Sequence, residues 1–387
     1  MRLKVKNNKK KLKAPKLRFP EFTDDWDKCE LGEILKTHSF RKYLSIPQTY
    51  GDIEIIQQGD KPILGYSDGK PFTEYADIIL FGDHTVSLYK PTKPFFIATD
   101  GVKILSADGF DGQYLFATLE RYKPESQGYK RHFTILKNKG IWFTKNKNEQ
   151  FKIGSFFKEI DQLITLNQNK ISHIKDLKAG LLQKMFPKNG ETKPEIRFDG
   201  FTGDWKECKL GDVVDIFDGT HQTPEYTNSG VKFVSVENIR NLETKKYISQ
   251  KAYQKEYSNK QAEKGDVLMT RIGDIGTAKI IESTEPLAYY VTLALLKPKK
   301  VNSNFLAWLI GSSEIQKNIW KRTLHIAFPK KINLGEINKI ELTIPNISEQ
   351  KKIGKFFSQL DNLLTLYQCK LEHLQEQKKS LLKQMFI

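Results

Sequence analysis

The sequence has few cysteines and no pattern that would join them. Cys29, Cys208 and Cys369 are isolated, without Cys-x-x-Cys spacing and without a histidine cluster nearby. Disulfide frameworks depend on paired thiols, and zinc sites depend on closely spaced ligands. The sequence therefore favours neither kind of site, and its cysteine usage is typical of a protein of the reducing cytoplasm.

Long hydrophobic runs are also missing. The longest, Leu287–Leu296, contains a threonine and is about half as long as a membrane-spanning helix. The stretch Met1–Lys13 has seven basic residues and no acidic one, but it lacks the apolar segment of a secretion signal. We therefore expect no membrane partner, and we expect residues 1–15 to form a mobile basic arm.

A third absence concerns catalytic motifs. The segment Gly65–Pro71 is one residue too short for a Walker phosphate-binding loop, and it has proline where a hydroxyl must reach magnesium. The segment Gly273–Gly276 lacks the three-glycine dinucleotide fingerprint, so a turn explains it better. No motif for methyl transfer, nuclease chemistry or metal binding is recognisable. Catalysis by this chain alone is not expected.

Positive charge, by contrast, is abundant. Lysine and arginine outnumber aspartate and glutamate by 63 to 46, which gives a formal net charge of +17. Such a surplus favours a polyanionic partner, because binding releases the counterions condensed on it. Nucleic acid is the first candidate. The length of 387 residues allows two or three domains with hydrophobic cores.

Two near-copies of one long helix organise the chain. Residues 146–186 and 346–386 are offset by 200, and 19 of the 38 positions from Glu149 and Glu349 onward are identical. Each copy opens on Asn-x-x-Glu, in which the asparagine can cap the first turn and the glutamate can bind its free amides. Apolar residues recur every 3.5 positions, the period of a coiled-coil seam. The predicted seam consists of Ile160, Ile164, Ile171, Ile174, Leu181 and Met185 in the first copy and Leu360, Leu364, Tyr367, Leu371, Leu374, Leu381 and Met385 in the second.

A second repeat precedes each helix. Residues 17–35 and 196–214 are offset by 179 and share 9 of 19 positions. A repeated frame therefore surrounds two unlike segments. We expect an α+β protein with an internal pseudo-two-fold repeat, in which a pair of long antiparallel coiled-coil helices separates two mixed α/β domains. The expected boundaries are an arm at 1–15, a first domain at 16–145, a first helix at 146–186, a linker at 187–195, a second domain at 196–345 and a second helix at 346–387.

The unlike segments contain short apolar runs between turn residues, and this pattern predicts strands. The expected strands lie at 53–56, 77–81 and 95–98 in the first segment and at 231–236, 266–271 and 278–281 in the second, where an amphipathic helix is also expected at 304–320.

Several turns between these strands are rich in side chains that can pair with base edges or phosphates. The densest is the loop 218–224 (Asp-Gly-Thr-His-Gln-Thr-Pro), although a loop of this composition can equally cap its own turns. The histidines in these turns have no second metal ligand nearby. The candidate DNA-binding residues are Arg41, Lys42, Gln57, Asp83, His84 and Arg131 in the first segment and Thr220, His221, Gln222, Thr223, Asn238, Arg240, Thr270, Arg271 and Asp274 in the second.

Taken together, these features resemble the specificity subunit of type I restriction-modification systems. The resemblance extends from about Lys16 onward. It implies two target-recognition domains, each reading one half of a bipartite site in double-stranded DNA. The stretches that carry it are the repeated Phe-x-x-Phe-Thr-x-x-Trp (Phe19–Trp26, Phe198–Trp205), the loop 219–224 and the segments 233–239, 265–271 and 345–353.

The resemblance also implies partners. In that family methylation and ATP-driven restriction belong to separate modification (methyltransferase) and restriction (translocase/endonuclease) subunits. S-adenosylmethionine, ATP and magnesium are therefore expected in those subunits and not in this chain. Two other classes stay open on the residues alone. A stand-alone DNA-modifying or cleaving enzyme would bind a cofactor or metal, and a scaffold without a nucleic-acid partner would bind its targets independently of salt.

The two repeats carry a geometric expectation as well. Nine residues join Phe186 to Ile196, where the second frame begins, and nine residues span at most about 30–36 Å. In a repeated arrangement Phe386 is expected to lie equally near Leu17. Each helix would be roughly 50–60 Å long, so that the pair can set the distance between two half-sites.

Overall fold

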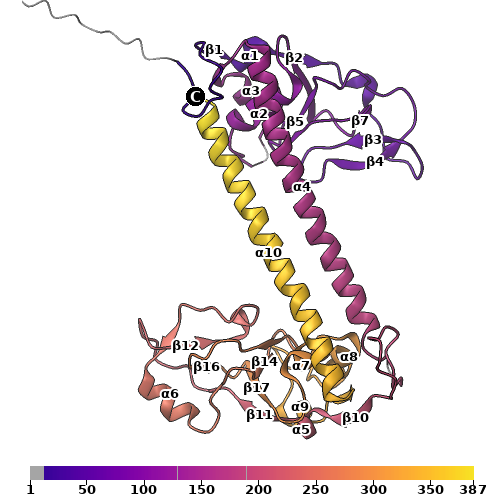
Figure 1. Ribbon diagram of the computed structural model, residues 1–387, viewed down its shortest axis with the longest axis vertical. Helices are drawn as coiled ribbons and strands as arrows, with labels where there is room; N and C mark the ends of the chain where they lie inside the picture. Colours follow the sequence, from indigo (N-terminus) through magenta and orange to yellow (C-terminus); the bar gives the residue numbers. More distant parts are fainter. Residues whose placement is uncertain (1–12, 129, 189) are drawn as a thin grey trace, which may run out of the picture. The chain divides into compact units, whose positions relative to one another are not determined.

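The computed structural model describes residues 13–128, 130–188 and 190–387. The chain forms two compact units, which we call the first unit (Met1–Asn169 with Cys369–Ile387) and the second unit (Lys170–Gln368). Two long helices, α4 (Lys147–Lys184) and α10 (Ile347–Met385), contribute to both (Figure 1). Of the predicted basic arm, all but residues 13–15 lies outside the described residues. No helix of the described ranges is long and apolar enough to cross a membrane.

The first unit contains three small sheets and short helices. Its sheets have the strand orders β2-β8-β5-β6, β4-β3-β7 and β1-β9. Its elements are β1 (Asp27–Glu30), α1 (Leu31–Ile34), β2 (Leu35–His38), η1 (Arg41–Tyr43), β3 (Ile53–Ile56), β4 (Ile63–Ser67), β5 (Ile79–Gly82), β6 (Leu88–Tyr89), β7 (Phe95–Ile97), β8 (Val102–Ala107), α2 (Gly112–Tyr122), α3 (Phe133–Lys137) and β9 (Gly140–Phe143).

The second unit has the same kind of architecture. Its sheets have the strand orders β11-β17-β14-β15, β13-β12-β16 and β10-β18. Its elements are β10 (Lys206–Lys209), α5 (Leu210–Val213), β11 (Val214–Asp218), β12 (Val231–Val234), η2 (Val236–Asn238), β13 (Tyr247–Ile248), α6 (Gln250–Tyr257), β14 (Val267–Thr270), β15 (Ala278–Ile280), β16 (Leu287–Tyr289), β17 (Leu293–Pro298), α7 (Ser303–Ile310), α8 (Ser313–Lys321), α9 (Leu334–Asn338) and β18 (Glu341–Ile344).

The expected α+β class, with two mixed domains and a pair of long helices, is confirmed. The six predicted strands are present as β3, β5, β7, β12, β14 and β15. The single helix predicted at 304–320 is wrong. The segment is divided into α7 and α8 at Gly311. The amide of Gly311 donates to the carbonyl of Ala307 at 3.4 Å, and Ser312 is the N-cap residue of α8. Glycine in a helix interior is costly, so a break at this residue is favoured.

A buried ion pair fastens the frame to the start of each long helix. Arg18 donates to both carboxylate oxygens of Glu149, at 2.6 and 2.9 Å, and Arg197 donates to both oxygens of Glu349, at 2.6 and 2.7 Å. Both glutamates are fully buried. The expectation that these carboxylates bind amides of the first turn is wrong, because the arginines occupy them. The asparagine caps are present, with Asn346 Oδ1 accepting from the Glu349 amide at 3.0 Å.

The end of each long helix completes a core. In the first unit the ring of Phe386 lies 5.8 Å from the rings of Trp26 and Tyr114 and 6.2 Å from that of Phe157. Figure 1 shows the end of α10 beside the short helices of that unit. Burying an aromatic side chain among others is strongly stabilising. The last turn of α10 is therefore part of the core of the first unit.

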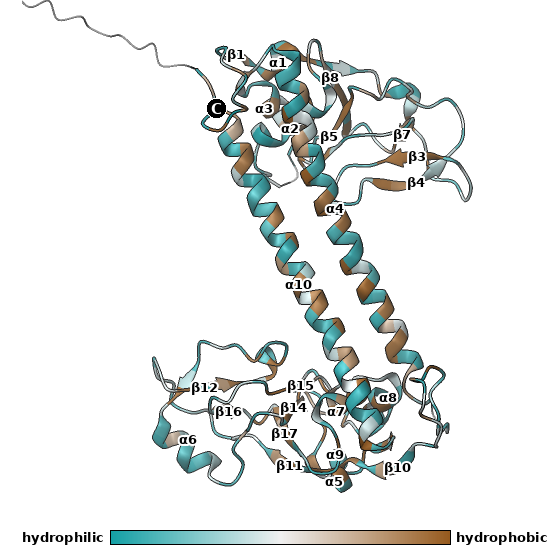
Figure 2. Ribbon diagram, in the orientation of Figure 1, coloured by the Kyte–Doolittle hydropathy of each residue, from teal (hydrophilic) through white to brown (hydrophobic). Residues whose placement is uncertain are grey.

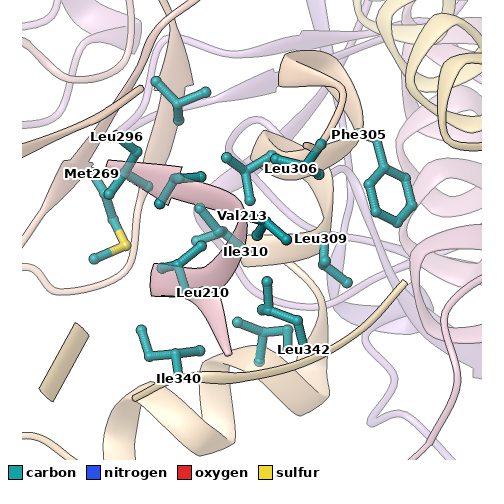
Figure 3. Packing of buried hydrophobic residues seen from close by; sticks show 14 of the residues in the cluster. Leu210, Val213, Met269, Leu296, Phe305, Leu306, Leu309, Ile310, Ile340 and Leu342 are labelled. Carbon is teal, nitrogen blue, oxygen red and sulfur yellow. The ribbon is translucent and has the colours of Figure 1, made fainter. Parts of the chain in front are cut away.

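The second unit repeats this arrangement with the end of α4. The ring of Phe186 lies 6.2 Å from that of Trp205, 5.8 Å from that of Phe305 and 6.0 Å from that of Phe357. The same core continues over α7, whose apolar side chains face those of α5 (Figure 3). Trp205, Phe186 and Phe357 thus match Trp26, Phe386 and Phe157.

Within each unit the two long helices run antiparallel. In the first unit Phe157 lies against Phe386, and Asp161 accepts from Lys378 Nζ at 2.5 Å. In the second unit Lys178 pairs with Asp361, while Phe186 lies against Phe357. Every predicted seam position is buried or half-buried. Figure 2 shows the apolar residues recurring along both helices among polar ones.

The nearness that the repeat predicts between the two ends of the frame is present. The amide of Leu17 donates to the carbonyl of Gln384 at 2.9 Å, and the amide of Ile196 donates to the carbonyl of Lys184 at 2.9 Å. Each frame therefore begins with a hydrogen bond to the end of a long helix.

Candidate nucleic-acid interface

In the second unit, three strands bring their loops together. Strands β11 and β14 each pair antiparallel with β17, so they run parallel to each other and end where β17 begins. Two loops therefore leave the sheet side by side, and a third segment joins them because the amide of Gly273 donates to the carbonyl of Lys330 at 2.9 Å. We call residues 218–223, 271–276 and 324–331 the second loop cluster.

A buried arginine holds this cluster together. Arg271 is 7% exposed and donates from Nη1 to Asp218 Oδ1 at 2.6 Å and to the carbonyl of Val291 at 3.1 Å. Its Nε donates to the carbonyl of Ile332 at 3.3 Å. The other carboxylate oxygen of Asp218 binds Nε2 of His221 at 2.8 Å. These hydrogen bonds tie Arg271 to Asp218 and to the neighbouring backbone, so Arg271 positions the loops in this conformation.

The rest of the loop 218–224 divides into an anchored part and an exposed part. Thr220 is 5% exposed, and its amide donates to the carbonyl of Tyr289 at 3.2 Å. A Cβ on Gly219 would lie 2.3 Å from the carbonyl oxygen of Tyr290, so only glycine permits this close approach. His221, Gln222 and Thr223 are exposed. These three are the side chains of the loop that can reach a partner.

The turn after β14 has the same division. Thr270 is fully buried, and its hydroxyl oxygen accepts from the amide of Thr277 at 2.9 Å. Asp274 is exposed and accepts from the hydroxyl of Thr277 at 2.8 Å. Gly273 has φ of 84°, a conformation that L side chains rarely adopt. Thr270 therefore shapes the turn, and Asp274 is its outward group.

The two remaining candidates of the second unit lie beside the cluster or apart from it. Asn238 closes the turn after β12, accepting from the amide of Ser235 at 3.1 Å and donating to the carbonyl of Glu243 at 2.8 Å. Arg240 is exposed and lines a hollow of about 530 Å³ together with Lys279 and Asp361. The structure does not bring Arg240 together with Arg271.

In the first unit, corresponding strand ends meet. The amide of Asp83, directly after β5, donates to the carbonyl of Gly101 at 2.8 Å, directly before β8. Asp83 is 3% exposed, and its Oδ1 accepts from the amide of Phe133 at 2.8 Å. Its carbonyl accepts from the amide of His132 at 2.8 Å. We call residues 57–59, 83–85, 127–128 and 130–132 the first loop cluster.

A buried histidine sets the conformation of this cluster. His132 is fully buried, its Nδ1 lies 3.0 Å from the carbonyl of Asp83, and its Nε2 accepts from the amide of Gln127 at 3.0 Å. Because Nε2 accepts, the ring proton is on Nδ1 and is donated to Asp83. The neighbouring Arg131 is exposed. Arg131 is therefore presented by a rigid support.

The other first-unit candidates surround this support. The amide of His84 donates to Oε1 of Gln58 at 3.0 Å, and Nε2 of Gln57 donates to the carbonyl of Lys61 at 2.9 Å. Arg41 and Lys42 are exposed on η1, after β2. The cluster thus joins Gln57, Asp83, His84 and Arg131, whereas no described contact ties Arg41 or Lys42 to it.

Two buried tyrosines support the second loop cluster. Burial raises the pKa of the hydroxyls of Tyr257 and Tyr289, which lie under the second loop cluster. The hydroxyl of Tyr257 donates to the carbonyl of Tyr289 at 2.7 Å, so it supports the strand next to the loop. Within the described part of the chain, no group of three or more His, Cys, Asp or Glu side chains could hold a metal ion. The arrangement suits recognition by hydrogen bonds and charge.

Two exposed lysines of the second loop cluster were not among the sequence candidates. Lys330 and Lys331 immediately precede Ile332, whose amide donates to the carbonyl of Arg271 at 2.9 Å. In the first unit Arg131 precedes His132, whose amide donates to the carbonyl of Asp83. Lys331 and Arg131 are 200 residues apart, the offset of the repeated helix. That offset, applied to Arg131, is the sequence signal that would have identified Lys331.

Comparison with known proteins identifies relatives. Residues 202–376 match the family described as type I restriction modification DNA specificity domain. The type I restriction enzyme MjaVIII specificity subunit of Methanocaldococcus jannaschii is 24% identical over 249 residues, which are 60% of this chain and 58% of that protein. The putative type I restriction enzyme MjaX specificity subunit of the same organism is 27% identical over 196 residues, covering 47% and 45%. The matches thus span about half the length of these relatives.

Solved structures share the fold along nearly the whole chain. The crystal structure of a type I restriction-modification S subunit from M. genitalium covers 97% of this chain and 99% of its own, with a TM-score of 0.66 and 18% identity. A second structure, from work on the assembly of a type I restriction-modification system, covers 93% and 97% with a TM-score of 0.52 and 16% identity. The fold of this chain is therefore that of these proteins. The resemblance to type I specificity subunits is confirmed, since residues 202–376 match the type I restriction modification DNA specificity domain family and the fold of the chain is shared with these structures.

Proposed function

We propose that this chain is the DNA sequence-recognition subunit of a type I restriction-modification complex. Each loop cluster reads one part of a bipartite site, within domains bounded at 16–145 and 196–345. The observation that carries the proposal is that two sheets hold loops at the same strand ends and present different exposed side chains there. Reading two different half-sites requires two similar sheets whose loops expose different side chains.

The long helices have a proposed role of their own. They set the spacing between the half-sites and dock the modification subunits, while S-adenosylmethionine, ATP and magnesium are bound by the modification and restriction subunits. The chain itself is proposed to be non-catalytic. Inserting one heptad in each helix is expected to lengthen the unread spacer or to abolish binding, and an unchanged site would contradict this role.

The test of the function is to express the chain with its modification subunits in a host without other DNA methylation and to sequence the methylated positions. A sequence in two separated parts is expected. Replacing His221 and Gln222 by alanine should relax one part only, and replacing Arg131 by alanine should relax the other. Methylation without a bipartite pattern, or in the absence of this chain, would contradict the proposal. Methyl transfer by the rigorously purified chain alone would contradict its non-catalytic role.

A further inference from the structure

The segment 324–331 of the second unit exposes two large apolar side chains almost completely. Ile326 is 100% exposed and Phe328 is 104% exposed, the two highest values among the exposed large hydrophobic side chains of the described residues. Single exposed apolar residues are common on protein surfaces. Ile326 and Phe328 lie two positions apart on one loop, and neither side chain is covered by other residues. Together they form a small exposed apolar tip, which is typical of a binding surface.

The charge within the segment that carries this tip is of one sign. The stretch Lys321–Lys331 reads Lys-Arg-Thr-Leu-His-Ile-Ala-Phe-Pro-Lys-Lys and contains no acidic residue. Lys321, Lys330 and Lys331 are exposed. DNA complements an apolar tip between lysines, because its stacked base pairs are apolar and its phosphates are negatively charged.

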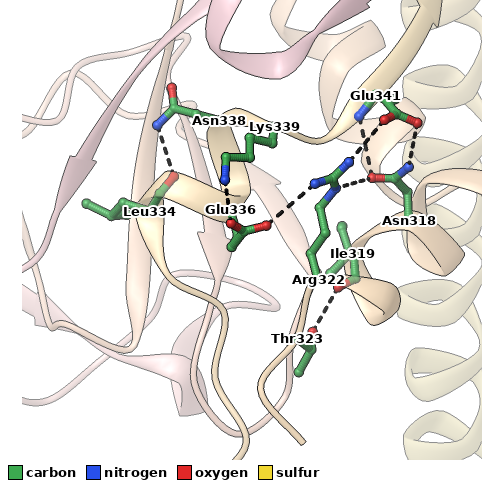
Figure 4. Close-up of polar contacts among 9 residues, drawn as sticks. All are labelled: Asn318, Ile319, Arg322, Thr323, Leu334, Glu336, Asn338, Lys339 and Glu341. Atoms are coloured by element: carbon green, nitrogen blue, oxygen red, sulfur yellow. Dashed lines mark hydrogen bonds and ion pairs between the residues drawn. The ribbon is translucent and has the colours of Figure 1, made fainter.

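The base of the loop is held firmly. The amide of Leu324 donates to the carbonyl of Lys331 at 2.8 Å, and Nζ of Lys330 lies 4.6 Å above the ring of Trp320. Figure 4 shows Arg322 fixed by Asn318, Glu336 and Glu341, at 2.9, 3.5 and 3.1 Å. A loop with a fixed base can present its tip at low entropic cost.

The position of the loop points to the same ligand as the proposed function. Its base is bonded to Gly273 and, through Ile332, to Arg271, so it belongs to the second loop cluster. Its lysines occupy the place that Arg131 occupies in the first cluster. A surface for another protein would have no reason to share this support with the candidate base-reading loops.

We propose that Phe328 and Ile326 form a wedge that inserts at a base step of double-stranded DNA in or beside the second half-site, with Lys330 and Lys331 on the flanking phosphates. This inference rests on the proposed function and deepens it. Proteins that insert apolar side chains between base pairs unstack one step and bend the duplex. The wedge therefore makes recognition of that half-site depend on how easily one step unstacks, in addition to direct base contacts.

The test uses the full chain assembled with its modification subunits and a duplex carrying the methylated site, with 2-aminopurine placed at successive positions of the second half-site and of the base pairs on either side of it. Unstacking raises the fluorescence of this base. The unaltered complex is expected to raise it at one step. The double variant I326A/F328A is expected to lose the increase and to bind roughly five- to a hundredfold more weakly, the range that a lost base–aromatic contact covers. The variant K330A/K331A should weaken binding to site and non-site duplexes alike and lower the salt dependence.

The matched control is I46A/Y50A in the first unit, because Ile46 and Tyr50 are 83% and 82% exposed but belong to the other domain. This variant should leave the fluorescence of the second half-site unchanged. The wedge is overturned if no position responds to the unaltered complex, or if I326A/F328A responds like the control. It is also overturned if I326A/F328A no longer assembles with the modification subunits, since the tip would then dock a protein. If the unaltered complex did not prefer its site over a scrambled duplex, the proposed function itself would fail, and this is seen before any variant is compared.

Discussion

Asp83 in the first unit stands where Arg271 stands in the second. Each directly follows a strand that pairs with the sheet's longest strand. The carbonyl of Asp83 accepts from the amide of His132, and the carbonyl of Arg271 accepts from the amide of Ile332. The side chains carry opposite charge and gather different partners. Lys103 lies 3.7 Å from the Asp83 carboxylate, whereas Asp218 lies 2.6 Å from the Arg271 guanidinium. The two units therefore turn at equivalent positions, but the side chains at these turns carry opposite charges.

The contacts at the two ends of the long helices differ far less. The ion pair at the start of each long helix and the phenylalanine at its end recur with the same partners. Such an arrangement separates two tasks, because changes in the loops do not disturb the contacts that hold the frame. Four experiments test this difference between the loop clusters and the frame.

The largest expected effect is a change of recognition. Replacing residues 212–345 by the corresponding segment of a relative should change one part of the methylated sequence completely and leave the other part as it was. The measurement is sequencing of methylated positions in cells that carry the hybrid. The reciprocal exchange within 36–145 is the control and should change the other part. A hybrid altered in both parts would mean that the two clusters do not act separately.

The next effect concerns the cores. Phe386→Ala and Phe186→Ala should each lower the free energy of unfolding of their unit by about 3–5 kcal/mol, because each leaves a cavity among aromatic rings. Urea denaturation followed by circular dichroism measures the loss. The control is Phe151→Ala on α4, where the side chain is 64% exposed. Two losses of very different size would show that the repeated frames are not energetically alike.

A somewhat smaller effect is expected for the buried ion pairs. Glu149→Ala and Glu349→Ala each leave an arginine in a site that is largely closed to water, at a cost of about 3 kcal/mol. Glu21→Ala removes an exposed partner of Lys152 and should change the stability little, because solvent screens this pair. Thermal unfolding of the three variants compares them. If Glu349→Ala were as mild as Glu21→Ala, the pair would not fasten the frame.

The smallest effect is a dependence on pH. Burial raises the pKa of Asp161, although Lys378 opposes this. The folded state then holds the proton more tightly than the unfolded state, so this group's contribution to stability falls as pH rises above about 4, the ordinary value for aspartate. Asp161→Asn should remove that fall, which is about 0.5 kcal/mol because solvent screens a side chain that is a third exposed. Urea titrations at pH 4 and 6 measure it against Asp361→Asn as control, and an equal pH dependence in all three proteins would contradict the assignment.

The frame could be predicted from the sequence because its signals are local and repeated. A 3.5-residue period marks the face of each helix that is buried, and an offset of 200 relates the two copies. The Arg18–Glu149 pair was missed, because a capping role for Glu149 is equally consistent with its neighbours. Helices α2 and α6 were missed as well, since each is short and lies in a segment that otherwise predicts strands and turns.

The loop clusters could be predicted only as a set of candidate turns. The sequence identifies Thr270 and Arg271 as capable of binding DNA, but Arg271 is held by Asp218, more than fifty residues away, and Thr270 is held within its own turn by Thr277. It cannot distinguish a side chain that holds a loop from one that the loop presents. The side chains of Ile326 and Phe328 are apolar and would be expected in a core, yet they are exposed on a loop whose base is bonded to the neighbouring turn.

The place of Phe386 in the core of the first unit has a consequence for synthesis. Trp26 and Tyr114 leave the ribosome long before the phenylalanine that covers them, which follows Trp26 by about 360 residues. At roughly 5–20 residues per second this delay is about 20–70 s. The second unit is continuous from Lys170 to Gln368 and needs nothing made later, so the part of the protein that is translated second can be finished first. Until residues 369–387 emerge, the nascent first unit exposes an aromatic cleft, and a translation stall in α10 would leave that N-terminal unit unable to close.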